Sequence, residues 1–341
     1  MPDSHARRKL EHLRICIEDD VSARTLGSGL QSYQLHHCAL PELDLAEVDL
    51  TTRFLGHDLR APLMVSAMTG GTSEARKINH NLAAAAQALG LAMCVGSQRA
   101  AIEDPRLAHT YQVRDAAPGI MLCANLGAVQ LNYGYGPTEC QQAVDMIDAD
   151  ALVLHLNPLQ EALQPGGNAN FSGLIEKIAA VCSSLAVPVV VKEVGWGLSE
   201  HVVCKLCEAG VSAVDVAGAG GTSWSEVEKR RAQTTLGERV ATAFREWGIP
   251  TAQAILEARR AAPELPIIAS GGVQTGPDAA VALALGADLV GLARPLLRPA
   301  TTSAQSVQDE LTVLTEGLRV AMFCAGTRDV PALKRATVTC R

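Results

Sequence analysis

Two adjacent glycines, Gly271 and Gly272, follow an apolar segment at residues 266–269. Glycine lets the backbone approach a bound group closely and leaves its N–H groups free to bind an anion. A helical stretch and a second apolar segment at residues 289–292 then lead to Arg294, whose guanidinium can bind a phosphate through two hydrogen bonds. In (β/α)8 barrels, the loops after the seventh and eighth strands commonly hold a phosphate. Two glycines alone are equally typical of a tight turn, but together with Arg294 they favour a phosphate site.

A lysine, Lys192, ends another apolar segment, residues 187–191, where a strand would aim it at a barrel mouth. It could form a Schiff base or lie beside an anionic cofactor. Because Schiff-base lysines need a lowered pKa and the sequence offers no second cation nearby, the role beside an anion is favoured. Glu193 alternates to the other face of the strand and is not expected to be its direct partner.

A single carboxylate, Glu161, follows three neutral candidate ligands, His155, Asn157 and Gln160. One carboxylate among neutral groups is typical of a Mg²⁺ site that substrate phosphates complete. An isolated loop glutamate is more often only solvated. The position of Glu161 shortly after a strand favours the metal site.

Composition excludes several classes of protein. The net charge is −7 and the pI about 5.7, which argues against broad nucleic-acid binding. No apolar run reaches the roughly 20 residues of a membrane span, and the N-terminal stretch has no signal-peptide core. The ten cysteines are scattered, and the pair Cys204 and Cys207 lies in a helical stretch without a second pair, which disfavours zinc. We therefore expect a cytoplasmic protein without a membrane or nucleic-acid partner.

Strand-like and helix-like segments alternate from Ala61 onward. The strand-like apolar runs are residues 62–66, 91–95, 120–124, 151–154, 187–191, 213–216, 266–269 and 289–292. The helix-like stretches between them include residues 76–89, 139–147, 174–185, 199–209 and 252–261. Alternation of this kind predicts a parallel sheet, and eight units of this size predict a (β/α)8 TIM barrel. An open doubly wound sheet is the alternative, but the first strand lacks the expected glycine fingerprint.

Two further features concern the ends and loops of this barrel. Residues 1–60 are predicted to be an N-terminal arm with a hairpin, formed by residues 48–54 and 57–60, that closes the barrel bottom; residues 61–341 form the barrel. Residues 157–173 and 218–248 are the longest predicted loops, and long loops are usually lids or binding loops.

Most predicted strands end in polar residues or glycine. The residues at or just after these strand ends are, in chain order, Thr69, Ser97, Gln98, Arg99, Asn125, His155, Asn157, Lys192, residues 218–222, Gly271, Gly272 and Arg294. Active sites of such barrels lie at the C-terminal ends of the strands. Because these residues follow nearly every strand, we predict that together they form an active site.

The chain resembles the type 2, FMN-dependent isopentenyl-diphosphate delta-isomerases. The resemblance is carried, in order, by RRKLEHLRI (7–15), SAMTGGT (66–72), GSQR (96–99), ANLGAVQL (124–131), HLNPLQEALQPGG (155–167), VVKEVGWGLS (190–199), DVAGAGGTSW (215–224), ASGGVQTG (269–276) and GLARP (291–295). HLNPLQEALQP and AGAGGTSW together are highly specific, and the matches span almost the whole chain. One departure is that residues 167–170 read Gly-Asn-Ala-Asn, where the family often has an acidic residue.

The resemblance implies roles for individual residues. FMN would contact Ala67, Met68, Thr69, Ser97, Asn125, Lys192, Thr222, Gly271, Gly272, Ala293 and Arg294. The diphosphate substrate would contact Arg8, Lys9, Ser97, Gln98, Arg99, His155, Asn157 and Gln160, while Glu161 would hold Mg²⁺. Lys192, Gln160 and His155 would be the catalytic residues, and the arm would be disordered until it closes over substrate.

The implied reaction moves the double bond of isopentenyl diphosphate to give dimethylallyl diphosphate, without net redox. The family uses reduced FMN with NADPH as reductant, and a homo-oligomer is expected. This agrees with the residues themselves, because the ring contains no obvious pair of acid and base and a cofactor could supply that chemistry.

Three alternatives remain open from the sequence. An α-hydroxy acid oxidase is expected to have a histidine and an arginine soon after the sixth strand, but residues 217–248 contain no histidine. An IMP dehydrogenase would want a cysteine there, which is also lacking. A non-catalytic flavin or phosphate sensor differs from all of these enzymes only by its lack of turnover.

Overall fold

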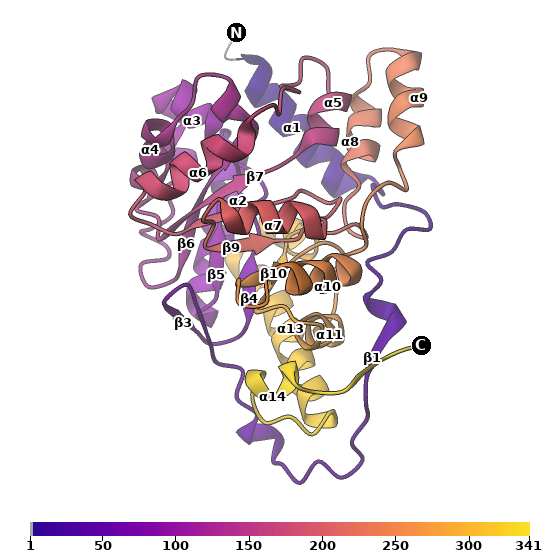
Figure 1. Ribbon diagram of the computed structural model, residues 1–341. Helices are drawn as coiled ribbons and strands as arrows, with labels where there is room; N and C mark the ends of the chain where they lie inside the picture. The colour runs from indigo at the N-terminus through magenta and orange to yellow at the C-terminus, as the bar shows by residue number, and fades with distance from the viewer. Residues whose placement is uncertain (1–2) are drawn as a thin grey trace.

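Eight parallel strands form a closed barrel in the computed structural model, which describes residues 3–341 (Figure 1). The first two residues of the predicted extension lie outside the described residues. The strands are β4 Leu63–Val65, β5 Ala92–Cys94, β6 Leu122–Gly127, β7 Ala151–His155, β8 Val189–Lys192, β9 Ala213–Asp215, β10 Ile267–Ala269 and β11 Leu289–Leu292. They pair in the order β10-β11-β4-β5-β6-β7-β8-β9. Each overlaps one predicted apolar run, so the predicted TIM barrel is confirmed.

The helices that surround the barrel follow from local signals. They are α2 Ser73–Leu89, α3 Arg99–Glu103, α4 Pro137–Ile147, α6 Leu174–Ser184, α7 Glu200–Glu208, α10 Thr251–Ala261, α11 Gly276–Ala284, α12 Arg294–Thr302, α13 Ala304–Cys324 and α14 Val330–Lys334. In α11, for example, the Thr275 hydroxyl accepts the Asp278 N–H while the Asp278 carboxylate accepts the Thr275 N–H. This reciprocal cap satisfies two backbone donors that a helix start otherwise leaves unpaired.

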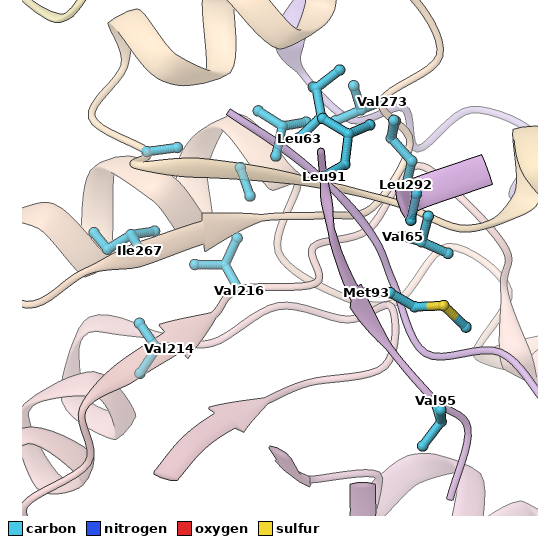
Figure 2. Packing of buried hydrophobic residues seen from close by; sticks show 14 of the residues in the cluster. Leu63, Val65, Leu91, Met93, Val95, Val214, Val216, Ile267, Val273 and Leu292 are labelled. Atoms are coloured by element: carbon cyan, nitrogen blue, oxygen red, sulfur yellow. The ribbon is translucent and has the colours of Figure 1, made fainter. Parts of the chain in front are cut away.

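Side chains alternate between two hydrophobic clusters along each strand. Leu63 and Val65 point outward to the helices, and Figure 2 shows them in this outer cluster. Met64 between them belongs to the cluster inside the barrel. The same period of two places Val189 and Val191 outward. Lys192 is therefore directed into the barrel mouth.

An antiparallel hairpin, β2 Thr52–Phe54 and β3 His57–Leu59, lies where the sequence predicts one. Its buried side chains Phe54 and Leu59 pack against the cluster inside the barrel. We propose on this basis that residues 1–60 are an extension of the barrel domain. A second small sheet pairs β1 Tyr33–Leu35 with β12 Val338–Cys340.

Four helices gather at one end of the barrel, and Figure 1 shows them together. They are α1 Asp3–Glu18, α5 Pro158–Leu163, α8 Trp224–Arg231 and α9 Thr235–Ala243. Both predicted long loops thus contain helices, α5 in the first and α8 with α9 in the second. Helix α8 packs against both α1 and α5. Over residues 3–18 the predicted arm is helical, and its ordering on substrate binding stays a prediction. Among residues 3–341, no helix is long and apolar enough to cross a membrane.

Candidate active site

One cavity of about 730 Å³ opens at the C-terminal ends of the strands. It is lined by Arg8, Lys9, Ala67, Met68, Thr69, Ser97, Arg99, Asn125, His155, Asn157, Gln160, Glu161, Lys192, Thr222, Gly271, Gly272, Ala293 and Arg294. The fold therefore brings together every site residue that the sequence singled out, except Gln98.

Gln98 is fully buried and does not line the cavity. Its side-chain amide donates to the Ala143 carbonyl at 2.8 Å, and its side-chain oxygen accepts the Asn125 N–H at 2.9 Å. Because both polar atoms of the side chain make these hydrogen bonds inside the fold, the side chain cannot also bind a ligand. Gln98 instead holds the end of β6, and with it Asn125, in place.

A glycine cradle forms where β9 and β10 end. Gly271 and Gly272 have φ of +103° and +75°, conformations that favour glycine. A Cβ on Gly271 would lie 2.1 Å from the Gly218 carbonyl oxygen, and one on Gly272 would lie 2.6 Å from Gly220. Any larger residue would therefore force the two loops apart. The cradle fits the close backbone approach that a bound phosphate requires.

Arg294 completes this cradle as the first residue of helix α12. A short extra helix after the last barrel strand is a common phosphate site, because its first N–H groups lack partners within the helix. The guanidinium of Arg294 also donates to the Ser22 hydroxyl at 2.5 Å. It lies 3.5 Å from the Asp20 carboxylate. The cradle thus combines bare N–H groups, a helix start and a positive charge.

Lys192 lies at the cavity floor and donates to the Glu193 carbonyl oxygen at 2.5 Å. The Glu193 carboxylate instead accepts the backbone N–H groups of Val194, Gly195 and Trp196. The expectation that this carboxylate is not the partner of Lys192 is confirmed. Burial raises the pKa of Glu193 to about 7, although those hydrogen bonds oppose the shift.

Asp215 on β9 stands beside Lys192 in the sheet register. Its side chain is 3% exposed and accepts the Ser270 hydroxyl at 2.7 Å. Burial raises the pKa of Asp215, and the nearby Lys192 charge opposes that rise. A second ionisable group therefore lies next to Lys192, although it does not itself line the cavity.

His155 is held as a neutral imidazole. Its Nδ1 lies 2.9 Å from the Asn125 side-chain oxygen, which can only accept, so Nδ1 carries the proton. Burial lowers the pKa of His155 to about 3, with smaller contributions from Lys192 and Lys9. In the neutral ring Nε2 is then a hydrogen-bond acceptor. His155 contributes an acceptor to the cavity and no positive charge near neutral pH.

Glu161 on α5 is 8% exposed and fixed by three donors. Its carboxylate accepts the Asn157 side-chain amide at 3.1 Å, the Gln164 amide at 2.5 Å and the Asn168 N–H at 2.6 Å. The side-chain oxygen of Asn157 is buried and lacks a hydrogen-bond partner in the described part of the chain. The carboxylate of Glu161 and the oxygen of Asn157 are thus two oxygen ligands on neighbouring residues that both line the cavity, and oxygen ligands suit a hard cation. Residues 3–341 contain no group of three or more His, Cys, Asp or Glu that could hold a metal, so other ligands would have to complete the site.

The departure at residues 167–170 packs directly on this carboxylate. A Cβ on Gly167 would lie 1.9 Å from the Glu161 carbonyl oxygen. Asn168 accepts a hydrogen bond from Arg99 at 2.9 Å through its side chain while its N–H binds Glu161. The neutral loop therefore ties Arg99 to Glu161.

Helix α1 covers the cavity and inserts Lys9. The Lys9 ammonium donates to the Ser97 carbonyl at 2.8 Å and to the Tyr111 hydroxyl at 2.5 Å. Burial lowers the pKa of Lys9 to about 7, and the neighbouring Arg8 adds to this effect. Glu228 of α8, which is 1% exposed, binds His12 at 2.8 Å and the Gln160 amide at 3.4 Å. The arm is thereby linked to both sides of the mouth.

Curated relatives match this chain over nearly its whole length. The isopentenyl-diphosphate delta-isomerase of Synechococcus sp. is 53% identical over 332 residues, which are 97% of this chain and 95% of the relative. The enzyme of the same name from Nostoc sp. is 50% identical over 96% of this chain and 94% of its own. That from Xanthobacter autotrophicus is 52% identical over 96% of both chains.

This chain belongs to the FMN-dependent isopentenyl-diphosphate delta-isomerase family. The model of the FMN-dependent dehydrogenases matches residues 4–112 and 153–340, so FMN is the cofactor of the family to which the chain is assigned. A mandelate oxidase variant with benzaldehyde is similar in structure, with a TM-score of 0.70 over 99% of this chain and 97% of its own. Because the two are only 19% identical, that likeness shows the shared barrel fold alone.

Four residues of this isomerase-family site were missed from the sequence. They are Ser22, Tyr111, Asp215 and Glu228, and each reaches the site across a contact between segments far apart in the chain. Asp215 carried a local signal, since it is a carboxylate inside the apolar run of residues 213–216. The other three carried none.

We expect the flavin released from the purified isomerase-family protein to be FMN and not FAD. The cradle at Gly271, Gly272 and Arg294 offers one phosphate site, and the chain has no dinucleotide fingerprint after its first strand. Chromatography of the released cofactor against both standards is the measurement. Recovery of FAD, or no flavin uptake on reconstitution, would contradict the expectation.

Proposed function

We propose that this protein isomerises isopentenyl diphosphate to dimethylallyl diphosphate, using reduced FMN, NADPH as reductant and Mg²⁺. The observation that carries the proposal is the presence of two anion-binding regions in one cavity. The glycine cradle and Arg294 follow β10 and β11, whereas Arg99 follows β5, where Lys9 also binds Ser97, and Glu161 follows β7. Strands β11 and β7 face each other, because three strands separate them in either direction around the barrel. A cofactor phosphate and a substrate diphosphate can thus bind on opposite sides of the floor.

The cofactor side is assigned to the residues that line the floor and the cradle. The flavin ring would contact Ala67, Met68, Thr69, Ser97, Asn125 and Lys192, and its phosphate Thr222, Gly271, Gly272, Ala293 and Arg294. Reduced FMN would supply the proton exchange that no pair of residues in the ring obviously offers. Lys192 would stabilise negative charge on the reduced ring, since its ammonium is already fixed at the cavity floor.

The substrate side is assigned to the helices over the mouth. Arg8, Lys9, Ser97, Arg99, His155 and Asn157 would bind the diphosphate, with Mg²⁺ held by Glu161. The neutral His155 would accept a hydrogen bond from a phosphate hydroxyl or a metal-bound water through Nε2. Gln160 would face the hydrocarbon, and its bond to Glu228 supports a fixed orientation of its amide.

Helix α1 would exclude water from the reacting carbons while it supplies Arg8 and Lys9. Exclusion matters because proton addition to the double bond creates carbocation character that water would trap. All ten cysteines are free thiols, which supports our proposal of a cytoplasmic enzyme. We also propose that the enzyme forms a homo-oligomer.

The proposal is tested by turnover of the purified protein with isopentenyl diphosphate, FMN, NADPH and Mg²⁺ without oxygen. Formation of dimethylallyl diphosphate supports it. Tight flavin binding without any turnover would instead favour a non-catalytic sensor.

We expect kcat/KM for isopentenyl diphosphate to fall as the pH rises through about 7. The pKa of Lys9 is lowered to about 7, so Lys9 is charged below that pH and neutral above it, and only the charged form attracts a diphosphate. Arginine keeps its charge at all these pH values, so Lys9→Arg should remove most of the decline. The measurement is kcat/KM from about pH 6 to about pH 9 for both proteins.

A matched control for this experiment is Lys177→Arg. Lys177 donates to the Leu131 carbonyl on the outside of the barrel, so this variant should keep the decline of the parent. A Lys9→Arg variant that binds FMN normally and declines as the parent does would contradict the assignment to Lys9.

A further inference from the structure

Residues 19–28, which we call the strap, connect helix α1 to the barrel along the edge of the glycine cradle. The Val21 carbonyl accepts the Ser223 N–H at 2.7 Å, and Ser22 pairs with Thr222 in an antiparallel bridge. Val21 is fully buried. The start of the strap therefore lies against the loop that contributes Thr222 to the cradle.

The far end of the strap closes on the cradle glycines. A Cβ on Gly220 would lie 2.1 Å from the Ser28 nitrogen, and one on Gly272 would lie 2.9 Å from the Ser28 Cβ. Between the two ends, the Glu246 carboxylate accepts the backbone N–H groups of residues 24, 25 and 26 at 2.6 to 3.0 Å. The strap is thus fixed at both ends and in its middle.

Arg294 joins the strap to the cradle through its side chain. It donates to the Ser22 hydroxyl at 2.5 Å, and Ser22 is one of the residues that line the cavity. The same hydroxyl donates its own O–H to the Asp20 carboxylate, which also accepts the Ser22 N–H at 3.1 Å, and an anion bound beside the guanidinium can replace that exposed carboxylate as the acceptor. The Asp20 carboxylate is 77% exposed, so its 3.5 Å contact with Arg294 contributes little in water.

We propose that the strap couples occupancy of the cradle by a phosphate to docking of helix α1 over the mouth, with Ser22 as the positioning residue. A phosphate held by Arg294 accepts the Ser22 O–H and so fixes the strap where α1 ends, at Glu18. The docked helix then presents Lys9 to Ser97 and Tyr111. By linkage, α1 docking strengthens binding of the phosphate by the same factor. The proposal rests on the assignment of the cofactor phosphate to this cradle.

The experiment compares FMN with riboflavin, which has the same ring and no phosphate. The protein is first stripped of its cofactor and then saturated with either FMN or riboflavin. Hydrogen exchange of the α1 amides is measured for both samples, and flavin fluorescence gives the affinity for each compound. FMN should slow exchange in α1 by about two- to tenfold relative to riboflavin, the value of one net hydrogen bond. Ser22→Ala should remove this difference, and Ser22→Thr should restore it.

Ser183→Ala is the matched control, since Ser183 is an exposed serine on α6 whose hydroxyl binds only the Ala180 carbonyl. It should leave the difference unchanged. Equal protection of α1 by FMN and riboflavin, with FMN bound more tightly, would overturn the coupling while leaving the phosphate assignment intact. Equal affinity for the two compounds would overturn that assignment and the coupling with it. A Ser22→Ala protein that keeps the full FMN-specific protection would overturn the role of Ser22.

Discussion

Replacing Glu161 with glutamine should lower turnover by tens of fold or more while FMN binding stays unchanged. The Glu161 carboxylate is buried next to Asn157, whose side-chain oxygen has no hydrogen-bond partner among the described residues, so the two residues would share a Mg²⁺ ion with the diphosphate. Glutamine keeps the size of the side chain but removes the negative charge. The measurement is kcat and kcat/KM as a function of Mg²⁺ concentration, together with FMN affinity.

The substitution also has a structural side, because the glutamine oxygen can still accept from Gln164 and Asn168, but its amide nitrogen cannot accept from Asn157 as the second carboxylate oxygen does. FMN affinity and hydrogen exchange of α5 report whether that loop is disturbed. Glu176→Gln, an exposed carboxylate in the first turn of α6, is the matched control and should behave as the parent. Normal activity of Glu161→Gln at limiting Mg²⁺ would refute the metal assignment.

NADPH should be consumed in an amount far below one molecule per molecule of dimethylallyl diphosphate formed. Substrate and product have the same oxidation state, so the flavin needs to be reduced once and then persists. Lys192 at the cavity floor would support that electron-rich ring through many turnovers. Counting oxidised NADPH against product under anaerobic conditions gives the ratio directly.

The same reaction in heavy water should place deuterium in the product, because one proton is added and another is removed. Dithionite should replace NADPH, since only the reduced state of the flavin matters. A ratio of one NADPH per product would indicate an oxidoreductase. Full activity with oxidised flavin alone would show that the reduced cofactor is not required.

The barrel and the position of its site could be predicted from the sequence because they depend on local patterns. Eight apolar runs of strand length alternate with helical stretches, and parallel strands joined in this way leave few other arrangements. The period of two along a strand then aims Lys192 inward. The glycine pair and Arg294 could be predicted for the same reason, since each follows a strand directly.

The family resemblance added what local patterns could not, namely that Arg8 and Lys9 of the extension belong to the cavity. Without it, a charged N-terminal stretch is read as a solvated end. The same resemblance placed Gln98 at the substrate, but its side chain is used inside the fold, between Ala143 and Asn125. A shared motif names the segment that lies near a site and not the direction of each side chain.

The tertiary structure alone decided which distant groups meet. Lys9 donates a hydrogen bond to the Tyr111 hydroxyl, and Arg294 donates one to the Ser22 hydroxyl. The Glu228 carboxylate forms hydrogen bonds with both His12 and Gln160. The tertiary structure also decided that His155 is neutral, because burial and the charges of Lys192 and Lys9 lower its pKa. These contacts join segments separated by up to 272 positions in the chain, so no periodicity or spacing encodes them. They follow only when the closed barrel brings its strand ends, its inserted helices and its N-terminal helix to one mouth.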